Sequence, residues 1–478
     1  MNIDQNLISR ITAEVMARVQ QQGNHGSGNS GIFNTIDEAV SAAHTAQKQL
    51  RKLTIEKREG LISAMREAAY ASAAMLAEMA VQESGMGRVS DKVLKNQLAA
   101  RNTPGTEDLR TEAWSGDTGL TLIEMGPFGV IGAITPTTNP SETVISNCIG
   151  MIAAGNSVVF SPHPTAKNTS LTAIRLLNEA IIKAGGPANL LTAVAEPSLA
   201  ATNAMMVHPQ INMLVATGGP AVVKAVMSSG KKAIGAGAGN PPVIVDESAN
   251  IERAARDIMA GCSFDNNLPC IAEKEAIVVS AVADRLITFM QKYGGYLISG
   301  QDIERLERVI LTEKEELAAS GCTEKPKKTF GVNKNFVGKD AKYIIKQIGI
   351  DVPDDIRVII CETAADHPFV LEELMMPVLP VIRVRNVEEA IQLAVSVEHG
   401  NRHTAVMHSQ SVDNLTRFAK AVETTIFVKN APSYAGIGVG GEGFTTFTIA
   451  GPTGEGLTSA RSFTRQRRCV LVDALSIV

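Results

Sequence analysis

Short apolar runs rich in β-branched residues alternate with amphipathic segments through most of this chain. The runs carry few polar positions, which is typical of parallel strands covered by helices on both faces. The alternation therefore predicts an α/β fold. We expect strands at Val130–Ile134, Ser157–Phe160, Met213–Ala216, Val243–Val245, Ala276–Val279, Arg357–Cys361 and Val381–Arg383. Helices are expected at Ile36–Leu53, Thr54–Glu83, Asp91–Arg101, Glu142–Ala154, Thr165–Ala184, Pro220–Ser228, Ile251–Cys262, Ala283–Tyr293 and Val387–Val397.

The bulk properties limit the classes of protein to consider. With 478 residues the chain exceeds what one hydrophobic core usually serves, and a second α/β series begins near Pro242, so we expect two main domains. A net charge of −4 and 4% aromatic residues give no reason to expect a nucleic-acid partner. We also expect no membrane span and no export signal, because no sufficiently long apolar run occurs. No metal site is expected, because the six cysteines form no C-x-x-C pair. A cytoplasmic protein with reduced thiols is the expectation.

The first residues differ from the rest of the chain. Ile3, Leu7, Ile11 and Val15 recur at helical spacing, and a run rich in Gly, Ser and Asn follows. We predict an amphipathic helix over residues 1–19 and a flexible linker over 20–33. Such a helix cannot bury its apolar face alone. We expect it to dock either on this protein's own body or a sister subunit or, as an interaction tag, on another protein.

Three glycine-rich stretches invite a nucleotide-binding interpretation. The runs at 235–242 and 436–443 are not followed by a clear helix, and the third run, at 451–456, lacks the Gly-Lys-Ser/Thr of a P-loop, so all three are interpreted as tight loops. Thr217-Gly218-Gly219 is the better candidate, because it follows a predicted strand and leads into a predicted helix that begins at Pro220. The free amides at such a helix start suit a pyrophosphate.

Several segments, in order, resemble the aldehyde dehydrogenase superfamily over nearly everything after residue 35. They are Pro127–Pro136, Ala153–Phe160, Thr217–Gly219, Phe264–Cys270 and Glu373–Val378. The resemblance implies a Rossmann-like NAD-binding domain, an α/β catalytic domain and a β oligomerisation flap. The corresponding boundaries are 34–235, with a ribbon at about 110–126, then 236–435, and 436–478 for a return segment and oligomerisation strand. A homodimer or homotetramer is implied as well.

The resemblance assigns the chemistry to Cys270, whose thiolate would attack an aldehyde and form a thioester. The oxyanion needs donors aimed at the developing charge. The backbone amide of Cys270 is one, and the other is Thr138, which aligns with the superfamily asparagine, or its neighbour Asn139. His399 and His403 either lie near the acyl-transfer step or stabilise a turn.

The resemblance also implies which residues bind NAD. Glu373 would contact the nicotinamide ribose, whereas Ser161 to His163 would line the adenosine end. The full set of implied cofactor-binding residues is Thr135, Pro136, Thr137, Ser161, Pro162, His163, Thr217, Gly218, Gly219 and Glu373.

Departures from the superfamily pattern indicate what accepts the acyl group. Hydrolytic members carry a glutamate that activates water, but no Glu or Asp occurs from Lys231 through Val245. The segments Ser161–Pro164 and Pro136–Pro140 and the residue Met375 also depart from the hydrolytic pattern. These variants resemble the coenzyme A-acylating members, in particular the propionaldehyde and acetaldehyde enzymes of bacterial microcompartments.

In those enzymes an N-terminal helix on a polar linker directs the protein into a shell, so residues 1–19 imply a shell-protein partner and a location inside a microcompartment. Two alternatives stay open, namely a hydrolytic NAD(P)-dependent enzyme that releases free acid and an inactive shell-binding scaffold. The sequence does not separate acetaldehyde from propionaldehyde, which differ by one methylene, or NAD from NADP.

Overall fold

The computed structural model of the chain describes residues 31–315 and 328–477. The predicted helix at 1–19 and the linker up to residue 30 lie outside the described residues. The predicted linker extends to residue 33, but Ile32–Phe33 form strand β1, because their backbone pairs in parallel with Ala193 and Val194. The ordered fold therefore begins earlier than the composition of the linker indicates.

The first of two large sheets has six parallel strands in the order β1-β6-β5-β4-β7-β8. From β4 the chain proceeds to β5 and β6 on one side, then returns to β7 and β8 on the other. The order thus reverses between β4 and β7, and open α/β sheets bind ligands at the carboxyl ends of the strands at such a point. The strands span β4 (Val130–Thr135), β5 (Ser157–Pro162), β6 (Leu191–Val194), β7 (Met213–Thr217) and β8 (Lys232–Ala236).

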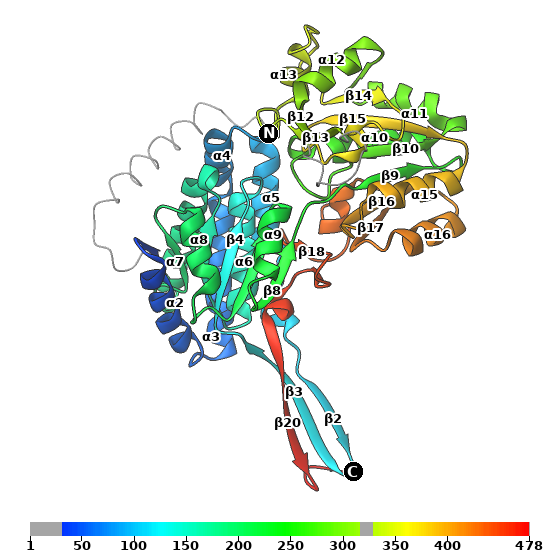
Figure 1. Ribbon diagram of the computed structural model, residues 1–478. Helices are drawn as coiled ribbons and strands as arrows, with labels where there is room; N and C mark the ends of the chain where they lie inside the picture. Colours follow the sequence, from blue (N-terminus) through cyan, green and yellow to red (C-terminus); the bar gives the residue numbers. More distant parts are fainter. Residues whose placement is uncertain (1–30, 316–327, 478) are drawn as a thin grey trace, which may run out of the picture.

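Helices cover both faces of this sheet (Figure 1). Every residue of α6 (Pro140–Ala153) is buried, because this helix packs between the sheet and the helices around it. The others are α2 (Ile36–Leu50), α3 (Ile55–Ala71), α4 (Ala73–Ser84), α5 (Val89–Asn102), α7 (Lys167–Lys183), α8 (Leu199–Val207) and α9 (Pro220–Met227).

The single helix predicted over Thr54–Glu83 is wrong, since Ser72 separates α3 from α4. Ser72 has φ −93° and ψ 3°, outside the helical region. Ala69 and Ala73 on either side are both buried. The apolar pattern therefore shows no break where the backbone has one.

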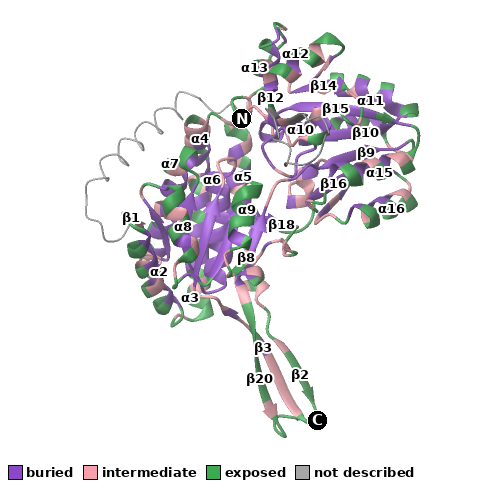
Figure 2. Ribbon diagram, in the orientation of Figure 1, coloured by how far each residue is buried: buried purple, intermediate pink, exposed green. Residues whose placement is uncertain are grey.

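The second sheet has seven parallel strands in the order β11-β14-β15-β10-β9-β16-β17. They span β9 (Pro242–Val245), β10 (Glu275–Val279), β11 (Gly295–Ile298), β14 (Val358–Glu362), β15 (Val378–Val384), β16 (Thr404–His408) and β17 (Ile426–Lys429). The surrounding helices are α10 (Ile251–Ser263), α11 (Ser280–Lys292), α12 (Gln301–Ile310), α13 (Ala341–Lys346), α14 (Pro368–Leu371), α15 (Val387–Val397) and α16 (Val412–Val422). Figure 2 shows both sheets as the buried centres of their units.

Three smaller sheets complete the fold. Strands β12 (Leu311–Glu315) and β13 (Lys328–Val332) pair with each other, as do β18 (Ile449–Ala450) and β19 (Gly456–Leu457). A projecting antiparallel ribbon contains β2 (Glu112–Gly116), β3 (Gly119–Pro127) and β20 (Thr464–Val472) (Figure 1). No helix in the described ranges is long and apolar enough to cross a membrane.

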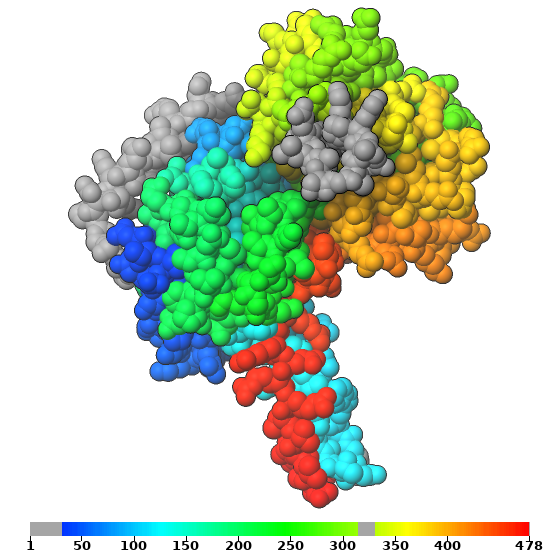
Figure 3. Space-filling model, viewed as in Figure 1, coloured from blue at the N-terminus to red at the C-terminus, as the bar shows by residue number. Residues whose placement is uncertain are grey.

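Each large sheet with its helices forms one unit, and the C-terminal segment joins the two units. It is red in Figure 3, where it lies between them and continues into the ribbon. Thr448 holds it to the first unit, because its hydroxyl bonds the Thr217 hydroxyl at 2.8 Å and Asn147 Oδ1 at 3.1 Å. The loops that follow β4 and precede β10 also meet, because Lys92 and Lys95 contact Thr138 and Asn139 on one side and Asp265 on the other.

Candidate active site

Cys270 lies in the turn between a short 3₁₀ segment, Phe264–Asn267, and β10. Its side chain is half-buried, whereas Cys148, Cys262 and Cys361 are fully buried. Cys469 is exposed on the ribbon. Among the described cysteines, Cys270 alone is both partly accessible and placed where the two units meet.

The loop that presents Cys270 has an unusual backbone. Asp265, Asn266 and Asn267 have φ of 47°, 55° and 64°, a left-handed conformation that costs of order 1–3 kcal/mol for each such residue. Side-chain hydrogen bonds compensate. Asn266 Nδ2 donates to the Gly338 carbonyl, and Asn267 Nδ2 donates to the carbonyls of Cys262 and Glu273, all at 2.9 Å. The surroundings thus hold the nucleophile loop in one strained shape.

The charges around Cys270 oppose one another. Burial and the Glu373 carboxylate raise the pKa of the Cys270 thiol to about 12, while the ammonium groups of Lys274 and Lys95 act to lower the pKa. Lys274 is 4% exposed and is anchored by hydrogen bonds to Asn267 O and Oδ1, at 2.9 and 2.7 Å. The thiol is therefore protonated in this state, with two cations placed to favour its thiolate.

The segment between β8 and β9 passes directly beside the nucleophile. A β-carbon placed on Gly239 would lie 2.6 Å from the Cys270 carbonyl oxygen and 3.0 Å from the His403 ring. The Gly239 N–H donates to the Glu373 carboxylate, whose pKa burial nevertheless raises. Glu373, Cys270 and Gly239 are thus brought together. None of the residues from Lys231 to Val245 is acidic.

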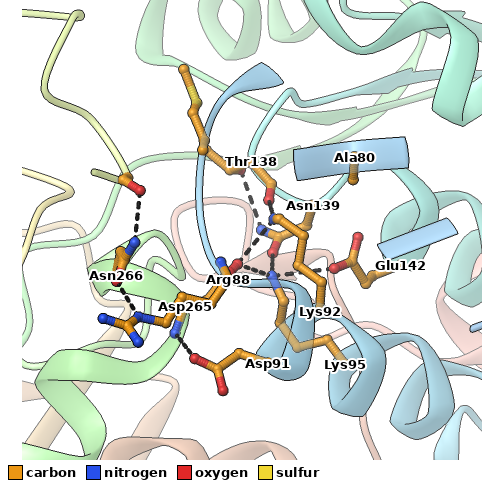
Figure 4. Close-up of polar contacts among 12 residues, drawn as sticks. Ala80, Arg88, Asp91, Lys92, Lys95, Thr138, Asn139, Glu142, Asp265 and Asn266 are labelled. Atoms are coloured by element: carbon orange, nitrogen blue, oxygen red, sulfur yellow. Dashed lines mark hydrogen bonds and ion pairs between the residues drawn. The ribbon is translucent and has the colours of Figure 1, made fainter. Parts of the chain in front are cut away.

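The two candidate oxyanion residues lie at the start of α6 (Figure 4). Asn139 is 8% exposed, and its Nδ2 donates to Thr138 Oγ1 at 3.2 Å. Its Oδ1 accepts from Lys95 Nζ at 2.5 Å. Both residues therefore stand at the catalytic region, and the Asn139 amide is part of a buried polar network.

That network contains two cations and two anions. Lys92 and Lys95 both donate to Asp265 Oδ2, at 3.0 and 2.5 Å, and Lys95 lies 3.2 Å from Glu142 Oε1. All four side chains are at most 1% exposed. Sequence reasoning missed them, because lysines on a helix usually face solvent. The available signal was that Lys92 and Lys95 share a helical face with Ala99, which is buried.

The residues predicted to bind NAD gather at one edge of the first sheet. Thr135 ends β4, Ser161 and Pro162 end β5, and Thr217 ends β7, three strands that are neighbours. The Thr135 hydroxyl is buried and has no hydrogen-bond partner among the described residues. Gly219 is the N-cap of α9 and, being a glycine, has no side chain to cap the helix. This edge of the sheet fits a dinucleotide, with the open start of α9 available for its pyrophosphate.

The other predicted residues are less directly placed. Thr137 bonds the Thr165 hydroxyl at 2.9 Å beside Pro136. His163 is exposed and caps the following 3₁₀ turn through its Nδ1. Burial lowers the pKa of His403 to about 4, so its ring is neutral, whereas His399 is exposed and bonds the Leu371 carbonyl.

A cavity of about 390 Å³ lies beside this region. It is lined by Pro220 and Val223 of α9 and by Asn401 and Pro452. Gly237 and Ala238 also line it. Gly239 follows them in the chain and lies beside Cys270, so the cavity borders the segment that reaches the nucleophile. No group of side chains suited to a metal ion occurs in residues 31–315 and 328–477.

Known proteins resemble this chain closely. Residues 6–326 and 356–448 match the model of the aldehyde dehydrogenase family. The propanal dehydrogenase (CoA-propanoylating) of Salmonella typhimurium is 50% identical over 98% of this chain and 97% of its own length. The acetylating acetaldehyde dehydrogenase EutE of Escherichia coli is 48% identical over the full length of both chains.

Solved structures agree with this. A propionaldehyde dehydrogenase from the fucose-utilisation microcompartment of Clostridium phytofermentans has a TM-score of 0.90 and 54% identity, covering 94% of this chain and 100% of its own. That of Rhodopseudomonas palustris, with bound CoA and an acylated cysteine, has a TM-score of 0.89 and 55% identity, with the same coverage. An engineered glycolyl-CoA reductase with bound NADP+ has a TM-score of 0.90 and 54% identity, covering 95% and 100%.

These matches confirm the predicted fold class and the resemblance found in the sequence. The family match covers well over half of the chain, and the curated relatives span its whole length. The chain therefore belongs to the aldehyde dehydrogenase family.

Proposed function

We propose that this protein oxidises a short-chain aldehyde with NAD+ and transfers the acyl group from Cys270 to coenzyme A. The overall reaction is aldehyde, CoA thiol and NAD+ to acyl-CoA, NADH and a proton. The relatives named above are a CoA-propanoylating propanal dehydrogenase and an acetylating acetaldehyde dehydrogenase. One similar structure contains CoA together with an acylated cysteine.

One observation carries the choice of CoA over water. The strand segment that touches Cys270 through Gly239 contains no carboxylate from Lys231 to Val245. Water needs a general base to attack a thioester, whereas a thiol ionises far more readily and needs less assistance. Glu373 lies near Cys270, but its carboxylate accepts the Gly239 N–H. It stays assigned to the cofactor ribose.

The residues divide the chemistry between them. Cys270 Sγ, as a thiolate, bonds to the aldehyde carbon, and Lys274 and Lys95 favour that charge state. The backbone N–H of Cys270 and the side chain of Asn139 or Thr138 receive the oxyanion. When bound, NAD+ supplies the hydride acceptor. The CoA thiolate then attacks the thioester carbon, and the Cys270 sulfur leaves.

The cofactor site is proposed at the carboxyl edge of the first sheet. Thr135 to Thr137, Ser161 to His163 and Thr217 to Gly219 would hold the dinucleotide there, and Glu373 would hold its nicotinamide ribose. NAD+ is the proposed cofactor. A similar engineered structure binds NADP+ instead, so both cofactors belong in the kinetic test.

Steady-state kinetics test this function. The purified protein, given propanal or acetaldehyde and NAD+, should produce NADH in a manner that saturates with CoA and yields acyl-CoA. Cys270→Ala should abolish this activity, while Cys148→Ala, a buried cysteine in α6, serves as a matched control that retains Cys270. Multiple turnovers to free acid without CoA would overturn the proposal in favour of a hydrolytic enzyme.

Location and assembly extend this proposal. We place the protein inside a bacterial microcompartment, with residues 1–19 as the segment that binds a shell protein, because a similar structure comes from such a compartment. The three-stranded ribbon exposes Trp114, Val470 and Val472, which supports its use in a homodimer or homotetramer. Deleting residues 1–19 should abolish co-purification with shells while CoA-dependent activity persists. Full co-purification of that variant would contradict the assignment.

A further inference from the structure

We infer that Lys95 is the positioning residue for the oxyanion site, because it fixes which end of the Asn139 amide faces the thiol. This inference rests on the proposed function and deepens it. It also decides between the two candidates left open by the sequence, since it makes Asn139 the side-chain donor and Thr138 its support.

The orientation follows from donor and acceptor chemistry. An ammonium group donates hydrogen bonds and accepts none, so the atom of Asn139 that lies 2.5 Å from Lys95 Nζ must be the carbonyl oxygen. The amide nitrogen then points to the opposite side, where one of its two N–H groups reaches Thr138 Oγ1 at 3.2 Å. Among the described residues, this is the only hydrogen bond that the Asn139 amide nitrogen donates. The second N–H is left to meet a developing negative charge.

The position of Asn139 in the helix agrees with this. Asn139 is the N-cap of α6, a place where asparagine usually accepts a backbone N–H of the first turn. Here the side chain makes no such cap. The Asn139 Oδ1 that would otherwise accept a helix N–H accepts from Lys95 instead. The amide group is therefore oriented by Lys95 and not by the helix.

Lys95 also joins the oxyanion side of the site to the nucleophile side (Figure 4). Its Nζ donates to Asp265 Oδ2 at 2.5 Å, and Asp265 is the first of the three left-handed residues that lead to Cys270. One buried ammonium group thus contacts both the Asn139 amide and the nucleophile loop. A shift of either element relative to the other would stretch one of two short charged hydrogen bonds.

Burial makes this arrangement rigid. Lys95, Asp265 and Glu142 are all fully buried, so neither water nor a mobile side chain can replace a lost partner. Two cations, Lys92 and Lys95, balance the two carboxylates. Lys92 provides a matched comparison, because it has the same charge, helix and anionic partner but bonds the Thr138 carbonyl in place of the Asn139 side chain.

The experiment is a pair of double-mutant cycles on the full chain. Lys95→Met and Lys92→Met are each combined with Asn139→Ala. The rate measured is the single burst of NADH without CoA, which reports thioester formation only. The thiolate fraction of Cys270 is followed separately in each variant by the pH dependence of iodoacetamide alkylation, since Lys95 also influences that pKa.

Lys95→Met should slow the burst by about 10²–10³-fold, as expected for loss of one oxyanion donor, with little change in the aldehyde concentration for half-saturation. The double mutant Lys95→Met/Asn139→Ala should be less than about threefold slower than Asn139→Ala alone, after both rates are corrected for the thiolate fraction. Lys92→Met and Asn139→Ala should come much closer to multiplying, because Lys92 reaches only the Thr138 carbonyl and not the Asn139 amide.

Multiplying effects for Lys95→Met and Asn139→Ala would overturn the inference, as would an unchanged burst in Lys95→Met. If Lys95→Met does not fold, the cycle is repeated with Lys95→Met/Glu142→Gln, which removes one buried charge of each sign. A wild type that forms free acid without CoA would reject the acyl acceptor proposed above. The cycle would still be readable, since the burst precedes acyl transfer.

Discussion

The carbonyl oxygen of Cys270 lies against Gly239, so closely that a β-carbon on Gly239 would stand 2.6 Å from it. Any side chain there must displace either the nucleophile loop or the strand segment, and the His403 ring at 3.0 Å blocks another direction. The backbone around the nucleophile is therefore set by contact with a glycine that is remote in sequence.

Gly239→Ala should lower the rate of thioester formation by at least tenfold, because displacements of about 1 Å at a reacting centre cost large factors in rate. The burst of NADH without CoA measures this. Gly60→Ala is the control, since Gly60 lies in α3 with no atom within 4 Å of an added β-carbon. It should leave the burst unchanged and raise stability by about 0.5–1 kcal/mol. An unchanged burst in Gly239→Ala would contradict the steric argument.

Neutralising Glu373 should activate the Cys270 thiol. The Glu373 carboxylate raises the pKa of Cys270, so Glu373→Gln should lower that pKa and speed alkylation by iodoacetamide at a fixed pH near 8. Lys274→Met should do the opposite, because the Lys274 ammonium lowers the same pKa. Alkylation rates from pH 6 to 10 provide the measurement. A slower reaction in Glu373→Gln would show that the carboxylate does not act through charge.

How far the sequence predicts this protein depends on which residues carry the signal. Strands β4, β5 and β7 were predictable because they are continuous β-branched apolar runs. Strands β6 and β16, with the sequences Leu-Thr-Ala-Val and Thr-Ala-Val-Met-His, were not. β6 has only four residues, both strands carry polar residues, and their place depends on neighbouring strands that only the folded sheet provides.

The site divides in the same way. Cys270 and Glu373 lie in segments that resemble a family, so their sequence alone singles them out. Lys92 and Lys95 have no such segment, and a lysine on an amphipathic helix is usually solvated. Their burial depends on Asp265, some 170 positions away, which the sequence does not link to them.

Removing the shared anion of the buried network should be costly. Asp265→Asn leaves Lys92 and Lys95 with Glu142 alone, and an uncompensated buried charge costs about 3–5 kcal/mol of unfolding free energy. The lysines also lower the pKa of Asp265, although burial opposes them. The advantage of the wild type is therefore present above pH 4 and is lost as the pH falls further. Urea unfolding at pH 7 and pH 3.5 tests both statements, and a constant difference would contradict the second.

Glu273 should destabilise the fold as the pH rises toward neutrality. This buried carboxyl accepts hydrogen bonds from the Ser433 N–H and hydroxyl at 2.8 and 2.7 Å, yet burial raises its pKa to about 7. Because the folded pKa lies above the unfolded value of about 4.3, the stability that the neutral form contributes is complete below pH 4 and falls until about pH 7, by roughly 3 kcal/mol.

Glu273→Gln lacks this titration, so its free energy of unfolding relative to the wild type should rise between pH 5 and pH 8. Urea unfolding of both proteins at the two pH values measures that difference. The control is Glu67→Gln in α3, since Glu67 is exposed and that variant keeps the Glu273 carboxyl. If the stability of Glu273→Gln relative to the wild type stays constant or falls between pH 5 and pH 8, the Glu273 carboxyl does not titrate in this range. That result would contradict the prediction.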